Sequence, residues 1–86
     1  MNVRIPTPLR SYTNDEKNVD ADGATIAEVL SDLDRRYPGI RFRVVDEQGQ
    51  LRKHVNLFVD GERVRDLSTD LDGVAELTIM QALSGG

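Results

Sequence analysis

The sequence predicts an α+β domain in which a mixed sheet of four to five strands packs on one main helix. Three observations lead to this prediction: one run of apolar residues at helical spacing, several short runs that alternate between apolar and polar residues, and the order of these runs. The 86 residues are enough for one small domain, and no repeat or low-complexity tract divides them.

The main helix is predicted over residues 25–37. Thr25 and Glu28 have the spacing of a capping box, in which a hydroxyl and a carboxylate bond free N–H groups of the first turn. Pro38–Gly39 ends the pattern. The apolar residues form one stripe that should pack on the sheet: Ile26, Val29, Leu30, Leu33 and Tyr37.

Two short strands are predicted before this helix. Asn2–Pro6 alternates, and Pro6 ends it because proline cannot donate to a sheet ladder. Lys17–Ala21 should return beside it as the second arm of a hairpin. The polar residues 7–15 between them are interpreted as a loop.

Two strands joined by a tight turn are predicted in the second half. Val55–Val59 alternates, with Asn56 and Phe58 facing away from the apolar side. Asp60–Gly61 is a strong signal for a two-residue hairpin turn, so Glu62–Val64 should be a short return strand.

The last strand is predicted over Glu76–Leu83. Leu77 and Ile79 should face the core, whereas Thr78, Met80 and Ala82 should face outward. The tail that follows should then leave the sheet.

The remaining segments are expected to be irregular. Ile40–Gln50 should be an irregular stretch in which Ile40, Phe42 or Val44 fills a gap in the core. Leu67–Gly73 should be a polar connection. Four glycines are interpreted as turn formers: Gly23, Gly39, Gly49 and Gly61.

The order strand, strand, helix, strand, short strand, strand predicts that the first and last strands lie adjacent and parallel at the centre of the sheet. This arrangement is a β-grasp roll. We therefore assign residues 1–83 to a β-grasp domain and residues 84–86 to a flexible reactive tail.

The composition excludes several kinds of chemistry. The chain has no cysteine and one histidine, which argues against disulfides, a catalytic thiol and a metal site of the usual kind. A net charge of -4 disfavours nucleic acid as a partner. No membrane-spanning run or signal peptide is seen, so we expect a cytoplasmic protein that is monomeric on its own.

Gly85–Gly86 at the end of the sequence is the most informative feature. A backbone without Cβ atoms can enter a channel too narrow for other residues, as an enzyme requires when the main-chain carboxylate itself reacts. The alternative is an ordinary frayed terminus.

Three further residues are candidates for an interface. Phe58 and Met80, with Ala82, lie on the face of the predicted sheet opposite the core and would form an apolar patch that a partner can contact. The alternative is that Pro6 or the loop 7–14 half-buries Phe58 or Met80.

Other polar residues are given structural interpretations. His54 is interpreted as a surface histidine, because a general base or ligand would need partners that the sequence does not supply. Arg35 and Arg36 end the helix, where cations favour the helix dipole, and a phosphate site is the alternative.

The whole chain resembles a MoaD/ThiS-type ubiquitin-like sulfur carrier, and most closely the CysO-like carriers. Asp60 stands where many relatives have Asn, and Ser84 where molybdopterin-pathway carriers often have Ala. The segments that carry the resemblance are Thr25–Leu30, Tyr37–Ile40, His54–Gly61 and Glu76–Gly86.

The resemblance implies a carrier rather than an enzyme. A ubiquitin-activating-type partner would adenylate the Gly86 carboxylate with ATP and Mg²⁺, and the adenylate would be converted to a thiocarboxylate that gives sulfur to a biosynthetic enzyme. Leu83, Ser84 and Gly85 would thread the tail into the partner, and no cofactor would be bound by the chain itself.

Two other functions use the same features. In a ubiquitin-like modifier, the activated Gly86 would form an isopeptide bond with a lysine of another protein. In a plain β-grasp interaction domain, the tail would have no role. Within the carrier class, cysteine, molybdopterin, thiazole and other sulfur metabolism all stay open.

Overall fold

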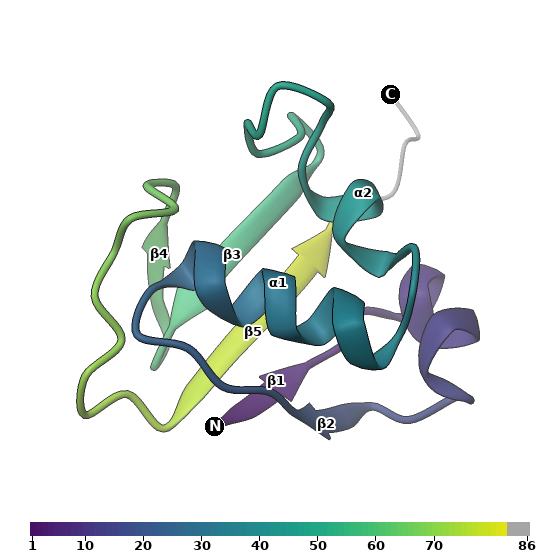
Figure 1. Cartoon of the computed structure of the whole chain (residues 1–86), viewed down its shortest axis with the longest axis horizontal. Helices are drawn as coiled ribbons and strands as arrows, with labels where there is room; N and C mark the ends of the chain where they lie inside the picture. The colour runs from purple at the N-terminus through teal and green to yellow at the C-terminus, as the bar shows by residue number, and fades with distance from the viewer. Residues whose placement is uncertain (83–86) are drawn as a thin grey trace.

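The computed structural model describes residues 1–82, and it has the predicted α+β architecture. One five-stranded mixed sheet, in the order β2-β1-β5-β3-β4, is covered on one face by helices (Figure 1). The strands are β1 (Asn2–Arg4), β2 (Asn18–Asp20), β3 (Val55–Val59), β4 (Glu62–Val64) and β5 (Glu76–Gln81). The helices are the 3-10 helix η1 (Thr7–Thr13) and the α-helices α1 (Ile26–Arg36) and α2 (Ile40–Val44).

The centre of the sheet is β5, which lies between the first strand and the middle hairpin. It runs parallel to β1, with Val3 opposite Leu77, and antiparallel to β3, with Leu57 opposite Ile79. Val3, Leu57 and the inward residues of β5 are all buried. The predicted central pair of first and last strands is therefore confirmed, as is the alternation that points Leu77 and Ile79 inward.

Helix α1 begins and packs as its sequence predicts. The Thr25 hydroxyl accepts the N–H of Glu28 at 3.3 Å, and the Glu28 carboxylate accepts the N–H of Ala24 at 3.2 Å. The reciprocal bond thus reaches one residue further back than in a standard capping box. The buried stripe of the helix comprises Ile26, Val29, Leu30 and Leu33, and Tyr37 at its end is half-buried.

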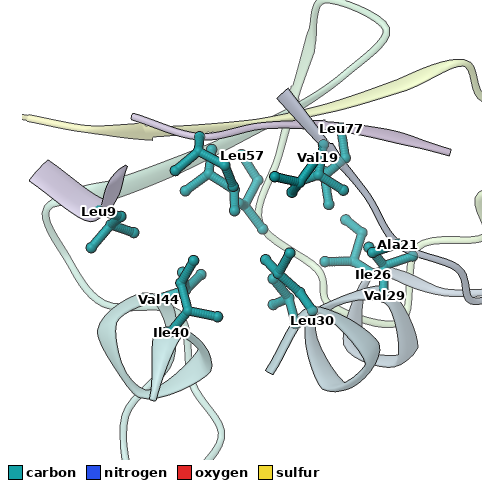
Figure 2. Close-up of a cluster of buried hydrophobic side chains, with 14 of the residues drawn as sticks. Leu9, Val19, Ala21, Ile26, Val29, Leu30, Ile40, Val44, Leu57 and Leu77 are labelled. Carbon is teal, nitrogen blue, oxygen red and sulfur yellow. The ribbon is translucent and has the colours of Figure 1, made fainter. Parts of the chain in front are cut away.

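The core fills the space between this helical layer and the sheet. Figure 2 shows Leu30 from α1 and Val44 from α2 on the helical side, with Leu57 and Leu77 on the side of the strands. Both layers contribute branched aliphatic side chains, which interdigitate. Within residues 1–82, every buried polar side-chain atom has a hydrogen-bond partner.

The segment after Gly39 corrects one expectation. It was expected to be irregular, but residues 40–44 form helix α2. Ile40 and Val44 are fully buried, whereas Phe42 is 51% exposed. The alternation of this run also fits a single helical turn, because residues four apart share a face and the residue between them faces away.

The segment 7–15 is a second correction, because η1 occupies most of the predicted loop. Leu9 is buried against the core. Pro8 lies in the first turn of this helix, where the N–H group that proline lacks would have no partner within the helix. Thr13 is buried too, with its hydroxyl 2.8 Å from the Glu16 carbonyl. One buried leucine in a polar run is too weak a pattern to predict this packing.

The predicted turn at Asp60–Gly61 is confirmed. Both residues have positive φ, 47° and 87°, which is the geometry of a two-residue hairpin between β3 and β4. The Asp60 carboxylate also accepts the N–H of Glu76 at 2.9 Å and that of Ala75 at 3.2 Å. This one side chain therefore joins the hairpin to the start of β5.

Gly23 is not a turn former of the predicted kind. Its φ lies outside the left-handed region, but a Cβ at this position would lie 2.5 Å from the Val29 nitrogen and 2.7 Å from Glu28 atoms. Glycine is required here because the chain passes directly against the first turn of α1.

Candidate functional site

The predicted reactive tail starts at the end of β5. The N–H of Ala82 donates to the His54 carbonyl at 2.8 Å, so the β3–β5 pairing extends one residue past the strand. Ala82 is exposed, as predicted. Leu83, Ser84, Gly85 and Gly86 lie outside the described residues, so their roles, and the division between residues 1–83 and 84–86, stay predictions.

A groove lies beside this point, and we call it the tail-root groove. It has a volume of about 460 Å³ and is bordered by η1, α2, the segment 52–54 and the end of β5. In Figure 1, α2 and the purple helix after β1 both lie near the tip of the β5 arrow. The residues that matter below are Tyr12, Phe42, Arg43, Arg52, His54 and Gln81.

Two arginines of the groove are held by aromatic residues, Arg43 through a hydroxyl and Arg52 through a main-chain carbonyl. Arg43 donates from Nε to the Tyr12 hydroxyl at 2.7 Å, and its guanidinium lies 5.9 Å from the centre of that ring. Arg52 donates from Nε to the Phe42 carbonyl at 2.8 Å and lies 4.8 Å from the Phe42 ring. These contacts fix both side chains at the wall of the groove.

Sequence reasoning did not find this groove. His54 was interpreted as a surface residue, and it is indeed exposed. The other groove residues come from positions far apart in the chain and meet only in the folded domain. An available signal was the run Arg41-Phe42-Arg43, in which an aromatic residue lies between two cations.

The outer face of the sheet carries the predicted apolar residues. Met80 is 51% exposed and lies opposite Asn56. Phe58 is half-buried, and its cross-strand neighbours are Thr78 and Arg63. Both side chains therefore lie opposite the core face, as predicted, while their role in an interface stays a prediction.

The alternative interpretation was that Pro6 or the loop 7–14 half-buries Phe58 or Met80. Only Met80 lies beside that segment. Met80 borders a second groove of about 490 Å³ whose other side includes Pro6, Thr7 and Pro8. Phe58 does not line that groove. Met80 thus lies beside the proline segment and still has half of its surface exposed.

The arginine pair at the end of α1 has a structural role. Arg35 lies 2.6 Å and Arg36 3.0 Å from the Asp32 carboxylate, which also accepts the Asp22 N–H at 2.8 Å. The Asp22 N–H and the Arg35 guanidinium lower the pKa of Asp32 from 3.8 to about 2. These cations are occupied by internal ion pairs, which favours the structural interpretation over a phosphate site.

Within residues 1–82, no group of three or more His, Cys, Asp and Glu side chains is arranged to hold a metal ion. None of the helices in this part of the chain has the length and apolar character needed to cross a membrane.

The fold and the exposed strand end at the tail root define a ubiquitin-like β-grasp protein. The chain belongs to the ThiS family, whose match spans residues 3–86. It is 40% identical over 89 residues to the sulfur carrier protein CysO of Mycobacterium tuberculosis H37Rv, and the alignment covers 98% of this chain and 96% of that protein.

Solved structures and a second relative agree with this placement. A chain of the Amycolatopsis orientalis BexX/CysO complex matches with a TM-score of 0.89 and 42% identity, covering 99% of this chain and 98% of that one. Small archaeal modifier protein 3 of Haloferax volcanii is 32% identical over 68 residues, which cover 76% of this chain and 73% of the relative.

Proposed function

We propose that this protein is a sulfur carrier whose Gly86 carboxylate is adenylated and then converted to a thiocarboxylate. The observation that carries the proposal is the 40% identity with CysO along 98% of the chain. The family match runs to residue 86 and so includes the Gly85–Gly86 pair.

The chemistry follows from the weakness of a carboxylate as an electrophile. In the first step a Gly86 oxygen attacks the α-phosphate of ATP, and pyrophosphate leaves with Mg²⁺ at the activating partner. In the second step a sulfide-level nucleophile (HS⁻) attacks the carbonyl carbon and AMP leaves, so that one carboxylate oxygen departs with the AMP and loss of a proton gives the thiocarboxylate. The carrier supplies only the reacting carboxylate, and the partner supplies the catalytic groups.

Each residue of the tail has a separate part in this proposal. Gly86 presents an unhindered carbonyl carbon, and Gly85 passes through a narrow channel without a side-chain clash. Ser84 and Leu83 are the proposed residues through which a partner would bind the tail by main-chain hydrogen bonds.

The partners are an adenylating enzyme of the ubiquitin-activating type and a biosynthetic enzyme that accepts the sulfur. The BexX/CysO complex supports the idea that a carrier of this kind assembles with another protein. Phe58, Met80 and Ala82 are the proposed contact residues, because two of them are exposed and Phe58 is half-buried on the face opposite the core.

The proposal includes a cytoplasmic location, because adenylation consumes ATP. The acceptor pathway follows from the partner, and cysteine synthesis is one of the pathways that stay open. Molybdopterin, thiazole and other sulfur metabolites use the same carrier chemistry.

The test uses the absence of cysteine from the chain. A thiol-selective alkylating reagent has no cysteine to modify here, so it reports sulfur at the C-terminus. Protein purified from its own host should carry this label, and its intact mass should contain one sulfur in place of one oxygen. Gly86→Ala should lower the labelled fraction by about a hundredfold, because a small displacement of a reacting group has a large effect on rate.

A matched glycine provides the control. Gly73 has positive φ and open space around it, so Gly73→Ala should cost about 1 kcal/mol of stability and leave labelling intact. The Gly86 variant should instead melt like the wild type. A wild-type protein without label, or a Gly86→Ala variant labelled normally, contradicts the proposal.

The similarity to small archaeal modifier protein 3 gives a second candidate, a modifier joined to lysines of other proteins. Both functions require the activated Gly86. They separate in one measurement, because conjugates leave a Gly-Gly remnant on substrate lysines after digestion, whereas a carrier gives the free thiocarboxylate.

A further inference from the structure

The tail-root groove differs from the rest of the domain in its charge. The protein has a net charge of -4. In contrast, the short stretch Ile40–Val44 contains Arg41 and Arg43, and Leu51–His54 contains Arg52 and Lys53, with no acidic residue in either. Helix α2 and the segment 52–54 both border the groove, so its wall is locally basic.

The cations of the groove have no acidic partner within residues 1–82. The ion pairs of that region use the Met1 ammonium, Arg35 and Arg36 as cations. Arg43 and Arg52 use Nε for the Tyr12 hydroxyl and the Phe42 carbonyl, which leaves the Nη edge of each fork for a carboxylate.

The nearest acidic turn does not neutralise them. Asp46 accepts the N–H groups of Gln48 and Gln50 at 2.9 and 3.0 Å, so its carboxylate closes its own turn. Glu47 is exposed and forms no ion pair in residues 1–82.

The groove also has a binding surface of fixed shape. Phe42 is 51% exposed although it is a large aromatic residue, and Arg52 lies over its ring. Arginine and aromatic residues held in place in this way dominate the binding energy of many protein interfaces, because little side-chain entropy is lost when a partner docks.

We propose that the tail-root groove binds an acidic segment of the protein that receives the tail. This inference rests on the proposed carrier function, because Gln81 lines the groove and Ala82 is bonded to His54 at its border. A protein that takes Gly86 into its active site binds the chain only four residues after Ala82, and so its surface comes close to the groove. Carboxylates are the groups that arginine guanidinium groups bind best.

The first experiment tests recognition with a defined probe, a hexaglutamate peptide added to ¹⁵N-labelled protein. We expect saturable shifts at the amides of Phe42, Arg43, His54 and Gln81 that vanish at about 1 M salt, where the screening length falls to about 3 Å. The double variant Arg43→Glu/Arg52→Glu should lose them. The matched variant Lys17→Glu/Arg35→Glu makes the same change in net charge elsewhere and should keep them.

Three results of this titration overturn the inference. The first is the absence of saturable shifts, and the second is shifts centred on Arg35 and Arg36. The third is tighter binding of a single-stranded RNA oligomer than of hexaglutamate at the same salt, which would indicate a nucleic-acid site. Thermal unfolding of each variant shows that a lost response comes from the groove and not from loss of the fold.

The second experiment measures the C-terminal sulfur label of the same variants in the host. We expect the labelled fraction of the Arg43→Glu/Arg52→Glu variant to fall about tenfold, because charge reversal in an interface slows association. The labelled fraction of the Lys17→Glu/Arg35→Glu variant should match that of the wild type. Equal labelling of all three proteins overturns the groove's role and leaves the carrier function standing. An unlabelled wild type overturns the carrier function. In that case the peptide titration alone decides whether the groove binds an acidic segment.

Discussion

At the end of the sheet where β5 begins, charged and polar groups are matched within the domain, whereas at the end where β5 stops the arginines of the groove have no ion pair within residues 1–82. Asp60 joins the hairpin to the start of β5, and Asp32 connects Asp22 with the end of α1. Arg43 and Arg52 have only aromatic and carbonyl partners in residues 1–82. The matched groups of the first end serve stability, and the second end is the one that we propose for contact with another molecule.

Among the changes at the stable end of the domain, the largest loss of stability should come from substitution of Gly23. Gly23→Ala places a methyl group 2.5 Å from the Val29 nitrogen, so α1 must move away from the chain before it. We expect a loss of about 3 kcal/mol in the free energy of unfolding, measured by urea denaturation. C-terminal labelling of the folded fraction should stay normal. A variant as stable as the wild type would show that the approach to α1 is loose.

The second effect concerns Asp60. Asp60→Gly keeps the positive φ of the turn but removes the acceptor for the N–H groups of Ala75 and Glu76, and should cost about 2 kcal/mol. Asp60→Asn retains one acceptor oxygen and should cost less. If both variants denature at the same urea concentration as the wild type, the carboxylate does not hold the hairpin to β5.

The smallest effect is a change in acid stability. The Asp22 N–H and Arg35 lower the pKa of Asp32 to about 2, below its ordinary 3.8. A pKa that is lower in the folded state stabilises the fold above the ordinary value, and this contribution is lost as the pH falls toward 2. Asp32→Asn should therefore melt below the wild type at neutral pH, and the two melting temperatures should converge between about pH 4 and pH 2. A gap that stays constant over this range would contradict the assignment.

The elements predicted from the sequence are those whose pattern is local and long enough. Local sequence was sufficient to predict the apolar stripe of α1, the turn at Asp60–Gly61 and the alternation of β3 and β5. Helix α2 was missed because Ile40, Phe42 and Val44 fit both an alternating run and one helical turn, and only burial distinguishes them.

The two candidate sites differ in how far the sequence could predict them. The outward positions of Phe58 and Met80 follow from strand alternation alone. The tail-root groove could not be predicted in this way, because Tyr12, Arg52 and Gln81 belong to different elements that meet only when the domain folds. Gly23 was misinterpreted for a similar reason, since its constraint is a neighbouring helix and not its own backbone angles.

The pairing of β1 with β5 has a consequence for synthesis on the ribosome. Asn2 lies opposite Glu76, so the central ladder closes a loop that contains nearly the whole chain. Such non-local contacts form slowly, and they cannot form at all before the last strand has left the exit tunnel. A chain shortened before Glu76 therefore lacks the central strand and cannot form the parallel ladder with β1. In a protein of this topology, the sheet is completed only after the last strand has been synthesised.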